Sequence, residues 1–151
     1  MTNDTKNKKA VIYVTGMQFG ENYSDGDDKI ETITPGSYRK IGEFYYIKYE
    51  EMQEGFTEKT DVLLKVKPGV LEITKKGLIH VNMLISTDET HQTNYKTPFG
   101  NLIFTIHGEK VTITEDEKGL HIYAKYGMDV NYEHLSVNEL KVEVKTEKEY
   151  N

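Results

Sequence analysis

Apolar and polar residues alternate along almost the whole chain, with a period of two residues. A clear example is the segment 59–67, in which Val62, Leu64 and Val66 share one face. This period places successive side chains on opposite faces of a β-strand, one towards a core and one towards solvent. No segment shows a sustained period of 3.6 residues, which a long amphipathic helix would require. The sequence therefore predicts a nearly all-β protein.

Turn-forming residues divide this pattern into short strands. Glycine, proline, asparagine and aspartate favour turns for definite backbone reasons, and they recur between the alternating segments. Pro35-Gly36 is interpreted as a bulge or bend inside a strand, Gly108-Glu109 as a turn between two strands, and residues 133–137 as a candidate helical turn. The predicted strands cover residues 9–19, 29–40, 44–51, 59–67, 70–75, 78–86, 91–97, 102–107, 110–115, 120–127 and 139–145.

Short strands joined by tight turns are typical of an antiparallel meander. A flat sheet of about ten strands would expose two unpaired edges that promote aggregation, and closure into a barrel removes them. About eight strands enclose packed side chains or one small ligand, and additional strands widen the interior. We therefore predict an all-β, antiparallel meander barrel of about ten strands. It forms a single domain over residues 1–151, with frayed ends at 1–8 and 146–151.

Composition restricts the chemistry and the compartment. The absence of cysteine excludes disulfides, a thiol nucleophile and cysteine-ligated metal sites, and it favours a reducing compartment. Residues 1–9 are polar and lack the apolar region of a secretory signal, and apolar runs are too short to cross a bilayer. The net charge of −6 disfavours nucleic-acid binding. We expect a soluble, cytoplasmic protein with no membrane or nucleic-acid partner.

Several short motifs resemble a known family. They are Gly36-Ser37-Tyr38-Arg39-Lys40, Tyr45-Tyr46-Ile47-Lys48-Tyr49-Glu50-Glu51, Lys76-Gly77, Met83, and Tyr95-Lys96-Thr97-Pro98-Phe99-Gly100. With these motifs the chain resembles the YwiB-like proteins, small bacterial proteins of unknown function with a calycin-like, lipocalin-related β-barrel. The resemblance covers about residues 31–144 and implies the barrel and a bacterial cytoplasmic location. It implies no activity.

Tyrosines form the most distinctive candidate group: Tyr38, Tyr45, Tyr46, Tyr49 and Tyr95. A tyrosine offers apolar area together with a hydroxyl that needs a partner when it is buried. Gathered at a barrel mouth, these side chains would hold a planar or amphipathic ligand by stacking and hydrogen bonds. Tyrosine also suits any half-buried sheet surface, and this structural interpretation is the more common one.

Arg39, Glu50 and Glu51 are the candidate charged residues. In a functional interpretation Arg39 holds a ligand anion while Glu50 orients it. In the structural interpretation, which is the more frequent, Arg39 forms a surface ion pair with a neighbouring carboxylate, worth about 0–1 kcal/mol. Glu50 and Glu51 are adjacent on a strand and point to opposite faces, so they cannot together flank a glycosidic bond.

No catalytic or metal-binding motif is recognisable. The five histidines lack the spacing of metal ligands, and His80, His107 and His121 fall out of phase with the apolar positions, so they should face solvent. No phosphate-binding loop and no serine nucleophile elbow is present. We therefore expect no metal and no cofactor.

The leading hypothesis is a non-enzymatic barrel that binds a small, partly apolar ligand in its interior or mouth. One alternative is an interaction or homodimer module that uses an exposed strand edge or aromatic patch. A second alternative is an enzyme acting on a small charged substrate near Arg39 and Glu50. The candidate ligand-binding residues are Tyr38, Arg39, Tyr46, Tyr49, Glu50 and Tyr95.

Overall fold

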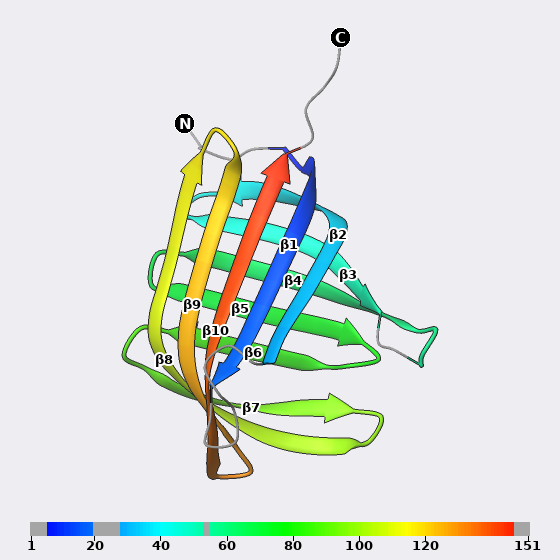
Figure 1. Cartoon of the computed structure of the whole chain (residues 1–151), viewed down its shortest axis with the longest axis vertical. Coiled ribbons are helices and arrows are strands. Elements are labelled where there is room, and N and C mark those ends of the chain that lie inside the picture. The colour runs from blue at the N-terminus through cyan, green and yellow to red at the C-terminus, as the bar shows by residue number, and fades with distance from the viewer. Residues whose placement is uncertain (1–5, 20–27, 53–54, 147–151) are drawn as a thin grey trace.

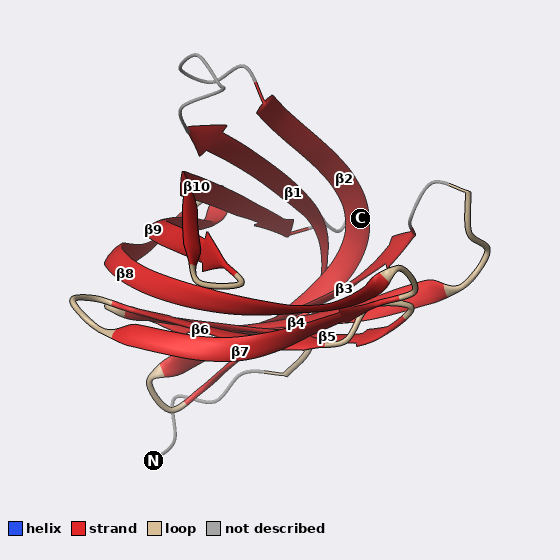
Figure 2. Ribbon diagram, turned by 90° about the horizontal axis from the view of Figure 1, so that it is seen from below, coloured by secondary structure: helices blue, strands red, loops and turns tan. Residues whose placement is uncertain are grey.

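The computed structural model describes residues 6–19, 28–52 and 55–146 of the chain. These residues form ten β-strands and no helix. Figure 2 shows the strands in red. The all-β prediction is therefore confirmed. The strands are β1 (Lys8–Phe19), β2 (Asp28–Ile41), β3 (Phe44–Met52), β4 (Lys59–Lys67), β5 (Val70–Gly77), β6 (Val81–Ser86), β7 (Thr90–Thr97), β8 (Gly100–Asp116), β9 (Gly119–Val130) and β10 (Glu133–Thr146).

The strands follow one another around a single curled sheet. Its order is β6-β5-β4-β3-β2-β1-β10-β9-β8-β7, and all of the paired neighbours are antiparallel. In Figure 1, β1, β8, β9 and β10 run steeply across the more horizontal β3 to β6. The two edge strands, β6 and β7, are consecutive in the chain and lie side by side. The predicted meander barrel is confirmed, as a nearly closed barrel.

Backbone hydrogen bonds hold the seam between β6 and β7 together near its two ends. At one end, His80 and Lys96 exchange two backbone hydrogen bonds with N···O distances of 3.0 and 2.9 Å. At the other end, the amide of Asp88 donates to the carbonyl of Gly108 at 3.0 Å, and the amide of Gly108 donates to the carbonyl of Glu89 at 2.9 Å. The turn after β6 is therefore attached to β8, on the far side of β7.

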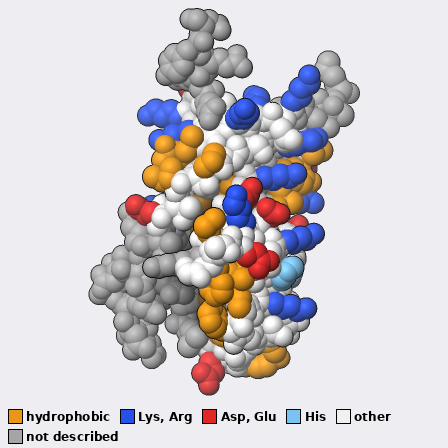
Figure 3. All heavy atoms as spheres, turned by 90° about the vertical axis from the view of Figure 1, so that its right-hand side faces the viewer, with side chains coloured by type: hydrophobic (Ala, Val, Ile, Leu, Met, Phe, Trp, Pro, Cys, Tyr) orange, Lys and Arg blue, Asp and Glu red, His pale blue; other side chains and the backbone are white. Residues whose placement is uncertain are grey.

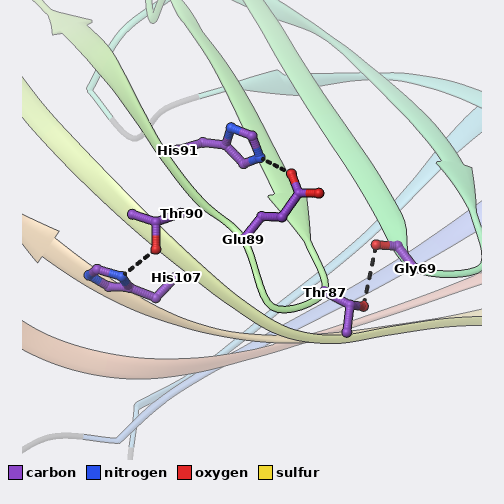
Figure 4. A network of polar contacts seen from close by, with 6 residues as sticks. All are labelled: Gly69, Thr87, Glu89, Thr90, His91 and His107. Carbon is purple, nitrogen blue, oxygen red and sulfur yellow. Dashed lines mark hydrogen bonds and ion pairs between the residues drawn. The ribbon is translucent and has the colours of Figure 1, made fainter.

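Polar side chains surround this turn (Figure 4). Glu89 contacts His91 at 3.1 Å, and the hydroxyl of Thr90 lies 3.1 Å from Nδ1 of His107. The hydroxyl of Thr87 donates to the carbonyl of Gly69 at 3.4 Å. These contacts connect the turn to residues next to β5 and on β8. Because the groups are exposed, the contacts orient the turn but add little to the free energy of unfolding.

Inward-facing apolar side chains fill the core of the barrel. They alternate with outward-facing residues along each strand, as the period of two predicts. Fully burying one of these side chains contributes about 1.5–3 kcal/mol. On β7 the inward positions are only half-buried, so β7 is the least buried strand. The best-buried core residues include Ile12, Ile47, Leu64, Leu71, Ile85, Ile106, Leu120, Val142 and Val144.

Two local predictions are wrong. Gly108-Glu109 is no turn: β8 continues through it, and a register shift between Gly108 and Lys110 marks a β-bulge. Residues 133–137 form no helical turn: they begin β10, which has a register shift between His134 and Ser136. In both places an extra residue in the ladder interrupts the alternation, and in sequence this looks like the end of a strand.

Other boundaries differ only slightly from the prediction. The strand predicted to begin at residue 78 begins at Val81. Pro35-Gly36 lies inside β2 as predicted, and the ladder to β1 passes it without a register shift, so it is not a bulge. Most of the ends predicted to be frayed, together with the loop residues 20–27, lie outside the described residues. Within the described part, no helix is long and apolar enough to span a membrane.

Candidate functional site

The wall of the barrel divides at one corner, where β2 and β3 separate. The two strands pair only from Gly36 to Ile41 on β2, whereas the first half of β2 pairs with β1 alone. β3 continues to Met52 and beyond Tyr49 pairs only with β4. At Gly36 the backbones are so close that a Cβ atom would lie 2.4 Å from the carbonyl oxygen of Lys48. Glycine is therefore required at the point of separation.

A cavity of about 750 Å³ lies at this corner, and we call it the corner groove. Its volume is within the range of small-molecule sites. Because the wall divides here, residues of both sheet faces contribute to the lining. The outward-facing lining residues are Pro35, Ser37, Lys48, Glu50, Met52, Lys59, Asp61, Leu63, Thr74 and Lys76, and the inward-facing ones are Thr34, Gly36, Tyr49, Glu51 and Val62.

The lining combines apolar and charged side chains. Figure 3 shows the side of the barrel on which β3 ends, with hydrophobic side chains lying among basic and acidic ones. Met52 is 60% exposed at the rim, and Leu63 is half-buried on the outer face of β4. Glu50 and Lys59 form an exposed ion pair with an N···O distance of 3.3 Å. An apolar floor with charged groups around it suits an amphipathic ligand.

A second set of polar residues lies behind the groove, inside the barrel. Glu51 and Lys75 form a largely buried ion pair with an N···O distance of 2.9 Å. Burial raises the pKa of Tyr49, and the negative charge of Glu51 raises it further. The pKa of Tyr95 is raised by the same two causes in the same order. The carboxylate of Glu51 therefore acts on tyrosines of both β3 and β7, and these three groups share one end of the interior.

Replacing Lys75 with methionine should lower the free energy of unfolding by roughly 1–3 kcal/mol, because it removes the cation that contacts the largely buried carboxylate of Glu51. Urea unfolding at pH 7 measures this change. Lys59→Met is the matched control: its ion pair is exposed, so the expected loss is at most about 1 kcal/mol. Equal losses in the two variants would contradict the prediction.

The six predicted ligand-binding residues lie on two faces of the sheet. Tyr38, Tyr49 and Tyr95 point inward, whereas Arg39, Tyr46 and Glu50 point outward. Tyr49 and Glu50 line the corner groove, and Arg39 and Tyr46 are cross-strand neighbours beside it. The structure does not gather all six in one pocket, and their contact with a ligand stays a prediction.

The inward tyrosines have partners of their own. The hydroxyl of Tyr38 lies 3.1 Å from the hydroxyl of Thr146, which belongs to β10 on the other side of β1. The ring of Tyr95 stacks on Phe104 with a centroid distance of 4.7 Å. The hydroxyl of Tyr45 donates to Glu115 on β8 at 3.1 Å. These contacts support the structural interpretation for Tyr38 and Tyr45.

The predicted ion pair of Arg39 with Glu50 or Glu51 is not formed. Glu50 pairs with Lys59 and Glu51 with Lys75. The register explains this result: Arg39 lies opposite Tyr46, four residues before Glu50 on β3, which corresponds to roughly 13 Å along a strand. Glu51, for its part, points into the barrel.

Three of the histidines lie as predicted, facing outward. His80 is exposed, His107 contacts Asp129 at 2.8 Å, and His121 contacts Asp116 at 3.0 Å. The hydrogen bond from His121 is the main cause that lowers the pKa of Asp116. The side chain of His134 lies outside the described residues. In the described parts of the chain, no three His, Asp or Glu side chains come together as potential metal ligands.

Sequence reasoning missed several groove residues, among them Lys48, Leu63 and Lys76. They come from three strands, and only the registers of β3 with β4 and of β4 with β5 bring them together. The half-buried outward Leu63 was the available signal, because a leucine on the wet face of a strand interrupts the polar alternation.

Comparisons with known proteins agree with this architecture. The family described as a domain of unknown function, DUF1934, matches residues 12–142. The crystal structure of the ywiB protein from Bacillus subtilis is similar, with a TM-score of 0.76 and 17% sequence identity, and the match covers 96% of each chain. At this identity the likeness shows the fold alone. No curated protein matches the chain. The chain therefore belongs to the DUF1934 family, the uncharacterised YwiB-like proteins, as its motifs indicated.

Proposed function

We propose that this protein is a non-enzymatic barrel that binds a small, partly apolar ligand in the corner groove. The supporting observation is the cavity of about 750 Å³ at a division of the barrel wall, where apolar and charged side chains meet. The core itself is lined by buried apolar side chains. The lack of cysteine favours a cytoplasmic setting for this binding.

Binding can be tested with the uncharged fluorescent probe N-phenyl-1-naphthylamine. We expect saturable binding with a dissociation constant of roughly 100 µM or tighter, as typical for an apolar probe of this size. Leu63→Ser should weaken binding about fivefold, since it removes apolar area from the groove. Amide chemical shifts of the unmodified protein should change at Ser37, Lys48 and Leu63 on addition of the probe.

Phe99→Ala is the matched control, because Phe99 is 87% exposed and lies in the turn between β7 and β8, outside the groove lining. Its affinity for the probe should equal that of the unmodified protein. Absence of saturable binding, or shift changes confined to residues around Phe99, would contradict the proposal. The homodimer and enzyme hypotheses stay predictions, because no arrangement of the described residues favours either over ligand binding.

A further inference from the structure

We propose that the ligand of the corner groove is an amphipathic organic anion whose carboxylate or phosphate group is held by Arg39 and Lys48. This inference rests on the proposed function, because it names the chemical class of the ligand at the same groove. It is carried by the cations without ion-pair partners that the outer face of β2, β3 and β4 presents beside the corner groove.

Arg39 is the only arginine in the sequence. Its Nε atom is buried and makes no hydrogen bond, and no carboxylate of the described residues forms an ion pair with its guanidinium group. Buried polar atoms in native proteins nearly always have a partner, so an unpaired one requires an explanation. A guanidinium group offers five donors in a planar fork that matches carboxylate and phosphate oxygens. An anionic ligand would accept hydrogen bonds from the outer nitrogens of this fork, because the buried Nε atom is shielded from the groove.

Two lysines place further positive charge next to Arg39. Lys48 lines the groove and forms no ion pair within the described residues, and it is a diagonal neighbour of Arg39 across the β2–β3 ladder. Lys65 lies opposite Tyr46, with its Nζ atom 4.4 Å from the ring centroid of Phe44 and 5.8 Å from that of Tyr46. Ser37 lines the groove and is two residues from Arg39 on the same face. Arg39 therefore lies next to two lining residues of the groove, Ser37 and Lys48, although it is not part of the lining itself.

The acidic residues of the groove lie farther from Arg39 than Lys48 does. Glu50 is four residues beyond the register partner of Arg39 and is already neutralised by Lys59. Asp61 lies opposite Glu50, on β4. The end of the groove near Arg39 therefore presents Lys48 directly beside its apolar register partner Leu63. At the other end the acidic residues lie among lysines, with Glu50 paired to Lys59 and Asp61 opposite Lys76. An amphipathic anion matches this sequence of surfaces.

A small anion suits this site better than a nucleic acid. The chain carries a net charge of −6, which repels a polyanion at long range. The cations near Arg39 are few and border a single cavity, so they can neutralise one ionised group rather than a row of phosphates. One arginine can bind a single carboxylate or phosphate group through two parallel hydrogen bonds.

The experiment compares two probes that share a ring system. 8-Anilinonaphthalene-1-sulfonate is N-phenyl-1-naphthylamine with a sulfonate group added, so the ratio of their affinities isolates the contribution of the anion. We expect the sulfonate probe to bind about tenfold more tightly, and the advantage to shrink as sodium chloride is added. Arg39→Gln should remove most of this advantage while leaving the affinity for the uncharged probe unchanged. Lys118→Gln, in the turn between β8 and β9, is the matched control and should change neither affinity.

Competition with octyl compounds then tests whether the site also binds a carboxylate or a phosphate group. Octanoate or octyl phosphate should displace the sulfonate probe at concentrations at which octanol does not. The inference is overturned if both probes bind equally, if Arg39→Gln leaves their ratio unchanged, or if octanol competes as well as the anions. These outcomes differ from failure of the proposed function itself, in which neither probe binds. Retained binding of the uncharged probe by Arg39→Gln also shows that this variant is folded.

Discussion

Gly108→Ala is expected to lower the free energy of unfolding by about 3 kcal/mol, even though it adds a single methyl group. A Cβ atom at this position would lie 2.0 Å from the carbonyl oxygen of Ser86 and 2.9 Å from its amide nitrogen. Both atoms belong to the backbone of β6, so no side chain can rotate away to make room. The clash would push β6 away from β8 and stretch the hydrogen bonds that the turn at Asp88 and Glu89 makes with Gly108.

Gly16→Ala is the matched control, because no atom lies within 4 Å of the added Cβ. It should be neutral or stabilise the protein by up to about 1 kcal/mol, through lower chain entropy in the unfolded state. Urea unfolding of both variants measures the difference. Loss of amide protection from hydrogen exchange at His80 and Lys96 would show that the seam opens. Equal stability of the two variants would contradict this role for Gly108.

The fold could be predicted from the sequence because alternation is a local signal. Val62, Leu64 and Val66 are buried on β4, and Val142 and Val144 on β10, at the positions that the period of two selects. Bulges were the places where this signal failed. At Gly108 the phase of the apolar positions shifts from Phe104 and Ile106 to Val111, and a shift of phase looks the same in sequence whether a turn or a bulge causes it.

The corner groove could not be predicted in the same way, because it depends on where two ladders end. Glu50 and Tyr49 were identified by residue type, but their neighbours Lys48, Leu63 and Lys76 depend on the registers of three strands. Arg39 was recognised as a candidate for binding an anion. Its lack of an ion-pair partner follows only from the register, which places Tyr46 opposite it and leaves Glu50 to Lys59.

Raising the pH from 10 to 12 should destabilise the barrel strongly, because two tyrosines are held as neutral phenols. Burial raises the pKa of Tyr126 to about 12, and burial with the charge of Glu51 raises that of Tyr49 still more. Below pH 10 both the folded and the unfolded chain keep these hydroxyls protonated, so the full stability is present. Above pH 10 the unfolded chain releases the protons and the folded chain does not, so the free energy of unfolding falls.

A retained proton contributes a slope of up to about 1.4 kcal/mol per pH unit. The tyrosine of the unfolded chain is already half ionised at pH 10, and Tyr126 of the folded chain is half ionised near pH 12, so Tyr126 alone accounts for roughly 2 kcal/mol over this window. Urea unfolding at several pH values over this window gives the slope for each variant. In Tyr126→Phe the slope should be smaller by about one proton, because phenylalanine has no proton to lose. Tyr132→Phe is the matched control. This side chain is 70% exposed, so the variant should show the same slope as the unmodified protein. If Tyr126→Phe keeps that slope as well, burial of Tyr126 does not hold its phenol neutral, and the alkaline loss of stability must come from other groups.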